Sequence, residues 1–327
     1  MYSSSNSKPE GPAATHLGHK IGPGWPETSA QNLGSRRLTM EPPPRYVQAM
    51  VNVTNHCNLS CAHCFVFRDG NPNNPANEMK AAPLLEELER LRDRHGIRSM
   101  IWMGGEPMLR WRVIKEGLHL FQRNTITTNG TIPLHDFGPD VTYVISLDGP
   151  PQVNDSVRGQ GVFDKVMLNL SKISEDFQST VMSQCVLHRQ NQHELEELVI
   201  ALQPTRIEGL TFSFYVPRAG ENSNRCWEDN KAREEAIEIV LSLKAKYPGF
   251  IWNSTRSLEL LRSPICDEVT RHCPLQQTLL PLYMEAGYLS TPFCCYGNDV
   301  DCQRCGSWGV FATAAKTGGP WEEKAGH

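Results

Sequence analysis

The sequence predicts an α/β fold, a partial (β/α)6 TIM-like barrel followed by a small irregular cysteine-rich C-terminal extension. Between residues 46 and 246, short apolar segments alternate about six times with segments of helical periodicity, which is the pattern of parallel βαβ units. Beyond residue 254 this periodicity ends and cysteines become frequent. We therefore expect a disordered or extended N-terminal arm (1–44), a core barrel (45–250), a cysteine-rich metal-binding region (251–312) and a flexible tail (313–327).

The first elements have clear sequence boundaries. Residues 46–53 are mainly apolar and predict a strand that leads directly into a cysteine-containing loop. Residues 84–95 predict a helix, because Pro83 precedes the apolar repeat and Gly96 follows it. A second short apolar strand, 99–103, ends at a pair of glycines.

The remaining elements continue the same alternation. Strands are expected at 125–128, 141–147, 180–187 and 210–216, and helices at 162–173, 194–202 and 234–246. The segment 282–289 predicts a β-hairpin with its turn at Ala286 and Gly287. In barrels of this kind the active site lies at the C-terminal ends of the strands, and the motifs described below fall there.

Composition excludes several classes of function. The 327 residues carry 32 basic and 36 acidic side chains, a net charge of −4, so no nucleic-acid partner is expected. No apolar run approaches the ~18 residues of a membrane span. The N-terminus lacks the apolar segment of a signal peptide, so we expect a cytoplasmic protein. In that compartment the eleven cysteines are expected to be metal ligands, buried apolar groups or reactive thiols rather than disulfides.

The most informative motif is a run of three cysteines after the first strand. Cys57, Cys61 and Cys64 are separated by three and then two residues, so their thiols can converge on one metal cluster. Three thiolates leave one metal position open, and an open position distinguishes a catalytic metal site from a structural one. A zinc knuckle completed by a remote ligand such as His56 is the alternative.

Four further motifs follow later strands in a fixed order. They are Met103-Gly-Gly-Glu-Pro107, Thr128-Asn-Gly130, Ser146-Leu-Asp-Gly-Pro150 and Arg158-Gly159. Together with the cysteine run, they resemble the radical S-adenosylmethionine (SAM) superfamily over roughly residues 46–215. The resemblance implies a [4Fe–4S] cluster on Cys57, Cys61 and Cys64, with SAM on the fourth iron. It also implies SAM contacts from His63, Gly104, Gly105, Glu106, Pro107, Asn129, Ser146, Asp148 and Arg158.

A second group of cysteines occupies the C-terminal region. Cys302 and Cys305 form a pair able to chelate one metal, and Cys266, Cys273, Cys294 and Cys295 precede them. This layout resembles a shortened form of the SPASM or twitch region that many radical SAM enzymes carry. The resemblance implies one auxiliary site made by Cys273, Cys294 or Cys295, Cys302 and Cys305. A second iron–sulfur cluster is expected there, and zinc is the alternative because four thiolates also suit it.

The resemblance implies a radical SAM enzyme that reductively cleaves SAM to a 5′-deoxyadenosyl radical. We expect it to modify a small-molecule metabolite in a biosynthetic pathway, by dehydrogenation, epimerisation, dehydration or a similar reaction, with a reducing partner such as flavodoxin or ferredoxin. Cys226 is a candidate hydrogen donor to a substrate radical, although it also reads as an ordinary surface cysteine. A maturase of a ribosomal peptide and a non-catalytic iron–sulfur or zinc-binding protein remain the alternatives.

Overall fold

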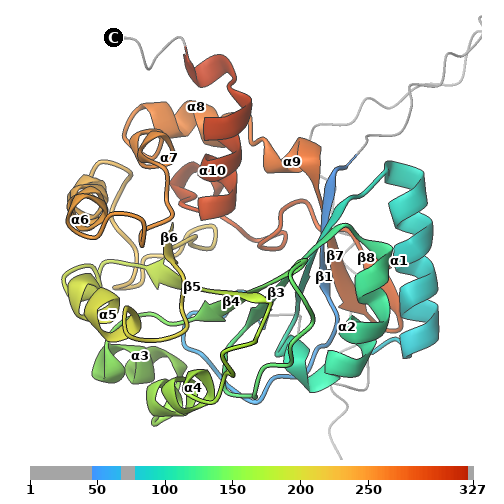
Figure 1. Ribbon diagram of the computed structural model, residues 1–327. Helices are drawn as coiled ribbons and strands as arrows, with labels where there is room; N and C mark the ends of the chain where they lie inside the picture. The colour runs from blue at the N-terminus through green and yellow to red at the C-terminus, as the bar shows by residue number, and fades with distance from the viewer. Residues whose placement is uncertain (1–45, 68–77, 323–327) are drawn as a thin grey trace, which may run out of the picture. The chain divides into compact units, whose positions relative to one another are not determined.

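The computed structural model of the protein describes residues 46–67 and 78–322 (Figure 1). Eight strands form one sheet in the order β6-β5-β4-β3-β2-β1-β7-β8. The strands β1 to β6 are parallel, and β7 extends the sheet by pairing in parallel with β1. The sheet is open, so the expected partial barrel is confirmed. The expected N-terminal arm lies outside the described residues.

The strands agree closely with the expected ones. They are β1 (Gln48–Asn52), β2 (Ser99–Met103), β3 (Arg123–Thr128), β4 (Val141–Ser146), β5 (Thr180–Leu187), β6 (Leu210–Phe214), β7 (Leu279–Glu285) and β8 (Tyr288–Ser290). The predicted hairpin is formed by β7 and β8, which pair in antiparallel fashion. Its turn is Ala286-Gly287, and both residues have positive φ angles.

Helices connect most of the parallel strands and cover the outer face of the sheet, whereas a loop without a helix joins β3 to β4 (Figure 1). They are α1 (Ala81–His95), α2 (Trp111–Gly117), α3 (Pro151–Arg158), α4 (Val162–Leu170), α5 (Leu195–Leu202) and α6 (Glu234–Lys246). The C-terminal region adds α7 (Thr255–Glu259), α8 (Ile265–Arg271), α9 (Leu275–Thr278) and α10 (Trp308–Thr317). Short 3₁₀ turns lie at η2 (Pro107–Arg110), η3 (Leu118–Leu120), η4 (Cys302–Arg304) and η5 (Pro320–Glu322).

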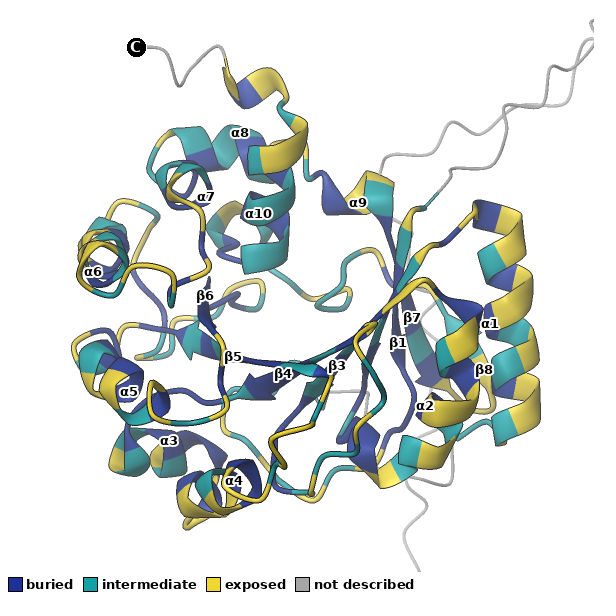
Figure 2. Cartoon of the chain, viewed as in Figure 1, coloured by how far each residue is buried: buried dark blue, intermediate teal, exposed yellow. Residues whose placement is uncertain are grey.

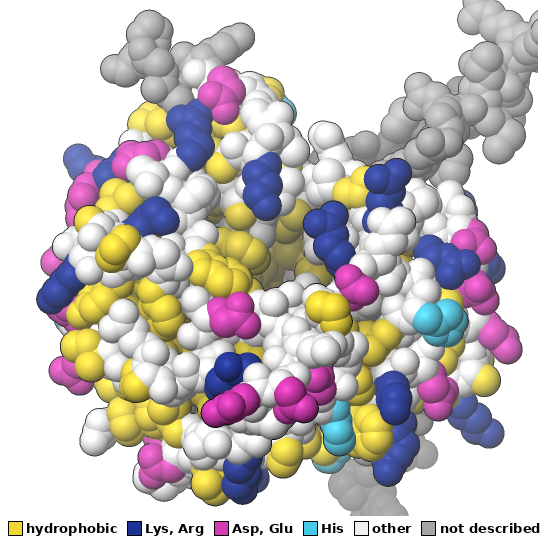
Figure 3. Space-filling model, viewed as in Figure 1, with side chains coloured by type: hydrophobic (Ala, Val, Ile, Leu, Met, Phe, Trp, Pro, Cys, Tyr) yellow, Lys and Arg dark blue, Asp and Glu magenta, His cyan; other side chains and the backbone are white. Residues whose placement is uncertain are grey.

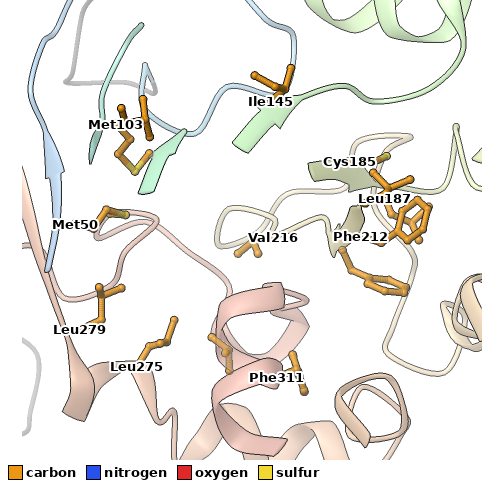
Figure 4. Close-up of a cluster of buried hydrophobic side chains, with 14 of the residues drawn as sticks. Met50, Met103, Ile145, Cys185, Leu187, Phe212, Val216, Leu275, Leu279 and Phe311 are labelled. Atoms are coloured by element: carbon orange, nitrogen blue, oxygen red, sulfur yellow. The ribbon is translucent and has the colours of Figure 1, made fainter. Parts of the chain in front are cut away.

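The core lies on both faces of the sheet, because helices cover one face and the C-terminal region approaches the other (Figure 2). Strand residues such as Val51 and Phe212 have no exposed surface. Side chains from β2, β4, β5 and β6 and from the C-terminal helices contribute to the buried apolar cluster drawn in Figure 4. Cys185 of β5 is one of them and is fully buried.

The prediction of a flexible tail at 313–327 is wrong for the first ten of these residues. Helix α10 continues through Thr317, and Ala314 within it is fully buried. Trp321 in η5 is 2% exposed. The cause is an apolar stripe, Val310, Phe311 and Ala314, whose spacing of three to four residues forms one face of a helix. Among the described helices, none is both long and apolar enough to cross a membrane.

Candidate active site

Two glycines hold the backbone that leads into the cysteine loop, residues 57–64. The Gly105 N–H donates to the Thr54 carbonyl at 2.9 Å, and the Glu106 N–H donates to the His56 carbonyl at 2.8 Å. A Cβ atom on Gly105 would lie 2.1 Å from the His56 oxygen, and one on Gly104 would lie 2.5 Å from the Thr54 oxygen. The glycines are therefore required for the close approach of two backbones.

Glu106 is a fully buried carboxylate inside this turn. It accepts hydrogen bonds from the Thr128 hydroxyl at 2.6 Å, the Asn129 N–H at 2.8 Å and the Met108 N–H at 3.0 Å. Burial raises the pKa of Glu106, and these hydrogen bonds oppose the rise. The carboxylate therefore joins β2 to the turn after β3, and the SAM contact expected of Glu106 stays a prediction.

Polar contacts fix the cysteine loop to two neighbouring elements. The Asn129 amide donates to Asn58 Oδ1 at 2.9 Å, and the Asn58 amide donates to the Thr131 hydroxyl at 2.8 Å. On the other side, the Ala62 N–H donates to the Val157 carbonyl of α3 at 2.8 Å. The loop is thus held between the turn after β3 and helix α3.

Asp148 is the centre of a buried charged network. Its Oδ2 lies 2.7 Å from both His63 Nε2 and Arg158 Nε, and its Oδ1 accepts from the Val186 N–H at 2.9 Å. Burial opposes ionisation of the carboxyl, but the Arg158 guanidinium and the His63 ring hold its pKa well below its usual range. Asp148 has no exposed surface, so it orients His63 and Arg158 from behind.

Most of the residues predicted to hold the cluster and SAM line one cavity, here called the central pocket, of about 150 Å³. Its lining includes Cys57, Cys61, Cys64, His63, Gly104, Gly105, Asn129, Ser146 and Arg158. Glu106, Pro107 and Asp148 do not line it. A space-filling view shows a hollow in the face of the molecule, with hydrophobic side chains around it (Figure 3).

Burial favours the protonated form of two thiols in the cysteine loop, those of Cys57 and Cys61. Burial raises the pKa of Cys57 to about 11, and burial also raises that of Cys61 against the attraction of Arg158. Within residues 46–67 and 78–322, no three His, Cys, Asp or Glu side chains are arranged as they stand to hold a metal ion. The donor set nevertheless fits a thiolate-bound cluster. The Leu59 N–H lies 3.4 Å from Cys57 Sγ, and the Asn129 amide lies 4.0 Å from it, so both can donate to a thiolate.

The C-terminal cysteines line a second cavity, here called the tail pocket. Cys273, Cys294, Cys295, Cys302 and Cys305 all border it. The sixth cysteine, Cys266, contacts Arg233 and Asp267 instead. Tyr296 lines both pockets, and its ring lies 4.6 Å from that of Phe65, which follows Cys64 in the chain.

Residues 51–202 match the family model of the Radical SAM superfamily. This segment of the chain is therefore similar to the radical SAM superfamily, as its motifs predict. It is 27% identical over 210 residues to an Fe-coproporphyrin III synthase of Methanosarcina barkeri, covering 60% of this chain and 51% of that protein. It is 26% identical over 202 residues to a pre-heme d1 synthase of Dinoroseobacter shibae, covering 58% and 49%. The chain thus spans about half the length of these curated relatives, whose names are those of enzymes, as expected from the sequence.

The fold is similar to that of a protein with a solved structure. The structure of Streptococcus suis SuiB bound to its precursor peptide SuiA superposes with a TM-score of 0.60 at 16% identity. The match covers 82% of this chain and 65% of SuiB. At this identity the similarity establishes the fold alone.

Several residues of the central pocket have no sequence motif around them. Gln184 and Val186 come from the end of β5, and Ser213 and Tyr215 come from the end of β6. Neither strand is followed by a glycine turn, so no local motif marks these four residues in the sequence. The rule that active sites lie at the C-terminal ends of parallel strands is the signal that could have found them.

Cys226, the candidate hydrogen donor, lies elsewhere. It is 7% exposed and borders a small separate cavity with Trp227 and Arg304. Its Sγ lies 3.6 Å from the Ser223 hydroxyl. The structure therefore does not bring Cys226 to the central pocket, and the expectation that it donates hydrogen to a substrate there has no structural support. Its reading as a surface cysteine is also wrong, because it is buried.

Proposed function

We propose that this radical SAM domain holds a [4Fe–4S] cluster through Cys57, Cys61 and Cys64 and cleaves SAM reductively. When bound, the cluster supplies an electron to the sulfonium of SAM, which gives methionine and a 5′-deoxyadenosyl radical able to abstract a hydrogen atom. The observation that carries the proposal is the shared lining of the central pocket. The three thiols face the same cavity as His63, Arg158 and the glycine turn.

Different residues of the pocket are proposed to bind different groups of SAM. Arg158 supplies a fixed positive charge for the carboxylate, because Asp148 holds the guanidinium in place. The turn at Gly104 and Gly105 exposes backbone without side chains and is assigned to the amino group. His63 borders the pocket and is assigned to the adenine ring.

A small-molecule metabolite is the proposed substrate. The far side of the central pocket mixes apolar and polar side chains, with Val186 and Phe214 beside Gln184 and Ser213. Such a lining is typical of sites that bury a small ligand and orient it with a few polar groups. The names of the two curated relatives, which refer to a coproporphyrin and to heme d1, support this class of substrate.

A peptide substrate is the second candidate. A wider cavity of about 530 Å³ borders the outer side of the cysteine loop and shares His63 and Tyr215 with the central pocket. Arg218, Glu221 and Arg225 give it a polar wall, which would suit an extended ligand. Isolation of a peptide that co-purifies with the protein and is altered on addition of SAM and reductant would favour this candidate.

We further propose that the tail pocket holds an auxiliary iron–sulfur cluster or a zinc ion. Cys273, Cys302 and Cys305 with Cys294 or Cys295 supply four thiolates in one cavity, which leaves no open metal position. Anaerobic iron and sulfide counting on the Cys57→Ala/Cys61→Ala/Cys64→Ala variant tests this assignment. About four irons remaining would establish a cluster. Zinc without iron would establish the alternative, and the absence of both metals would refute the site.

The cleavage of SAM is tested by measuring 5′-deoxyadenosine in the anaerobically reconstituted protein after addition of dithionite and SAM. We expect the product in the wild type and none in Cys61→Ala. Cys185→Ala is the matched control, because Cys185 is a buried thiol outside the central pocket. A wild-type sample that is fully loaded and reduced but forms no 5′-deoxyadenosine would refute the proposal and favour a non-catalytic protein.

A further inference from the structure

Arg233, immediately before α6, is a buried cation. Its side chain is 2% exposed, and its guanidinium donates to the backbone carbonyls of Cys305 and Leu261, each at 3.0 Å. Its Nε is buried without a hydrogen-bond partner. Carbonyl oxygens are neutral, so these contacts satisfy two donors but do not compensate the charge. A buried charge without a counter-ion is strongly destabilising.

Protein side chains supply only part of that counter-charge. Among the described residues, no carboxylate forms an ion pair with Arg233. Asp267 attracts the guanidinium electrostatically without forming an ion pair with it, and its Oδ1 accepts from the Asn230 amide at 2.8 Å and lies 3.6 Å from Cys266 Sγ. Cys266 contacts the guanidinium, yet burial raises the pKa of this thiol to about 11, so it stays neutral at physiological pH.

The remaining candidate is the tail pocket itself. Cys305 presents its carbonyl to Arg233 and its side chain to the pocket that the other tail cysteines share. Four thiolates carry four negative charges, and either Zn²⁺ or a [4Fe–4S]²⁺ core returns two positive ones. The loaded site is therefore a dianion with either metal centre, and its nearest ligand residue is in direct contact with a buried cation.

We propose that Arg233 is the counter-ion of the auxiliary metal–thiolate centre and strengthens its hold on the metal. The inference rests on the auxiliary site proposed above. Because the charge acts through space, a neutral residue at 233 should weaken metal binding even when the fold is intact. If the centre is an iron–sulfur cluster, loss of the cation should also lower its reduction potential, since the reduced cluster carries one more negative charge.

The test uses the Cys57→Ala/Cys61→Ala/Cys64→Ala protein as parent, so that all bound metal belongs to the tail pocket. Arg233→Met and Arg233→Gln remove the charge, Arg233→Lys retains it, and Cys266→Ala removes the neutral contact. The measurement is the rate of metal loss to a chelator, with circular dichroism as the check on folding. We expect metal loss about 10- to 100-fold faster for the neutral variants. Arg233→Lys should lose metal at a rate near that of the parent, as should Cys266→Ala.

The outcomes separate the two proposals. A parent that binds no metal overturns both the auxiliary site and the role of Arg233. A parent that binds metal, with neutral variants that lose it at the parental rate, overturns the role of Arg233 alone. If Arg233→Lys loses metal as fast as Arg233→Met, the hydrogen bonds to Cys305 and Leu261 stabilise the site rather than the charge. That result would refute the counter-ion role.

Discussion

At the residue scale, Asp148 shows how one buried carboxylate can fix two side chains that line a pocket. It holds His63 and Arg158 through contacts of 2.7 Å each and leaves both side chains on the pocket wall. The sequence motif around it suggested a direct SAM contact. Its complete burial became visible only in the folded chain, because the partners come from three separate elements.

Replacing Asp148 by Asn should destabilise the protein markedly. The change leaves the Arg158 guanidinium buried without its counter-charge, which typically costs about 3–5 kcal/mol. Because the folded pKa of Asp148 is depressed, its contribution is present above about pH 4 and is lost as pH falls below that value. Urea unfolding at neutral and acidic pH measures it. Asp93→Asn, which breaks an exposed pair with Arg92, should cost less than about 1 kcal/mol.

His188 predicts a second pH effect, of different origin. Burial lowers its pKa to about 4, Asp148 opposes this shift, and the neighbouring His63 and Arg225 add to it. Below pH ~6.5 a histidine in the unfolded chain binds a proton, whereas His188 in the folded chain stays neutral until about pH 4. The free energy of unfolding therefore decreases as the pH is lowered. Between about pH 7 and pH 4 we expect the wild type to lose roughly 3 kcal/mol more than His188→Gln. The same loss of unfolding free energy between about pH 7 and pH 4 in both proteins would contradict this.

At the element scale, the glycine turn after β2 positions the cysteine loop through backbone contacts. Gly105→Ala should displace the segment Thr54–Cys57, because the new methyl group would lie 2.1 Å from the His56 oxygen. We expect loss of iron from the cysteine loop and destabilisation of about 1–3 kcal/mol. Iron counting and thermal unfolding measure both effects.

Gly96→Ala is the matched control, because a methyl group there meets no atom within 4 Å. Gly96 has a φ of 74° at the end of α1, so alanine costs only local backbone strain. It should retain the iron of the wild type. Equal iron content in Gly105→Ala and Gly96→Ala would show that the turn does not position the loop.

The parallel strands were predictable from sequence, whereas several helices were not. β5 and α6 have the expected bounds, since long apolar or amphipathic segments with clear ends specify them. Helix α3 begins at Pro151, within a stretch interpreted only as a binding motif. The parallel pairing of β7 with β1 was also not foreseen, because it joins segments more than 200 residues apart and no local pattern encodes it.

At the scale of the whole molecule, the candidate sites were also predictable only where a local sequence motif encodes them. The cysteines, His63, Arg158 and the glycines were found from local motifs. The link between the two pockets was not, because Tyr296 and Phe65 meet only after the C-terminal region returns to the core. The ring contact between Tyr296 and Phe65 therefore lies where the central pocket and the tail pocket share a lining residue. We propose that one site has an open metal position for SAM and that the other is closed by protein ligands.

Electron paramagnetic resonance of the reduced protein, recorded with and without SAM, distinguishes an open cluster from a closed one. We expect an iron–sulfur signal that SAM alters in the wild type and in Cys302→Ala/Cys305→Ala. We expect no SAM-sensitive signal in Cys57→Ala/Cys61→Ala/Cys64→Ala. A signal that SAM leaves unchanged in the wild type, or a SAM-sensitive signal that disappears only when the tail cysteines are replaced, would contradict the proposal.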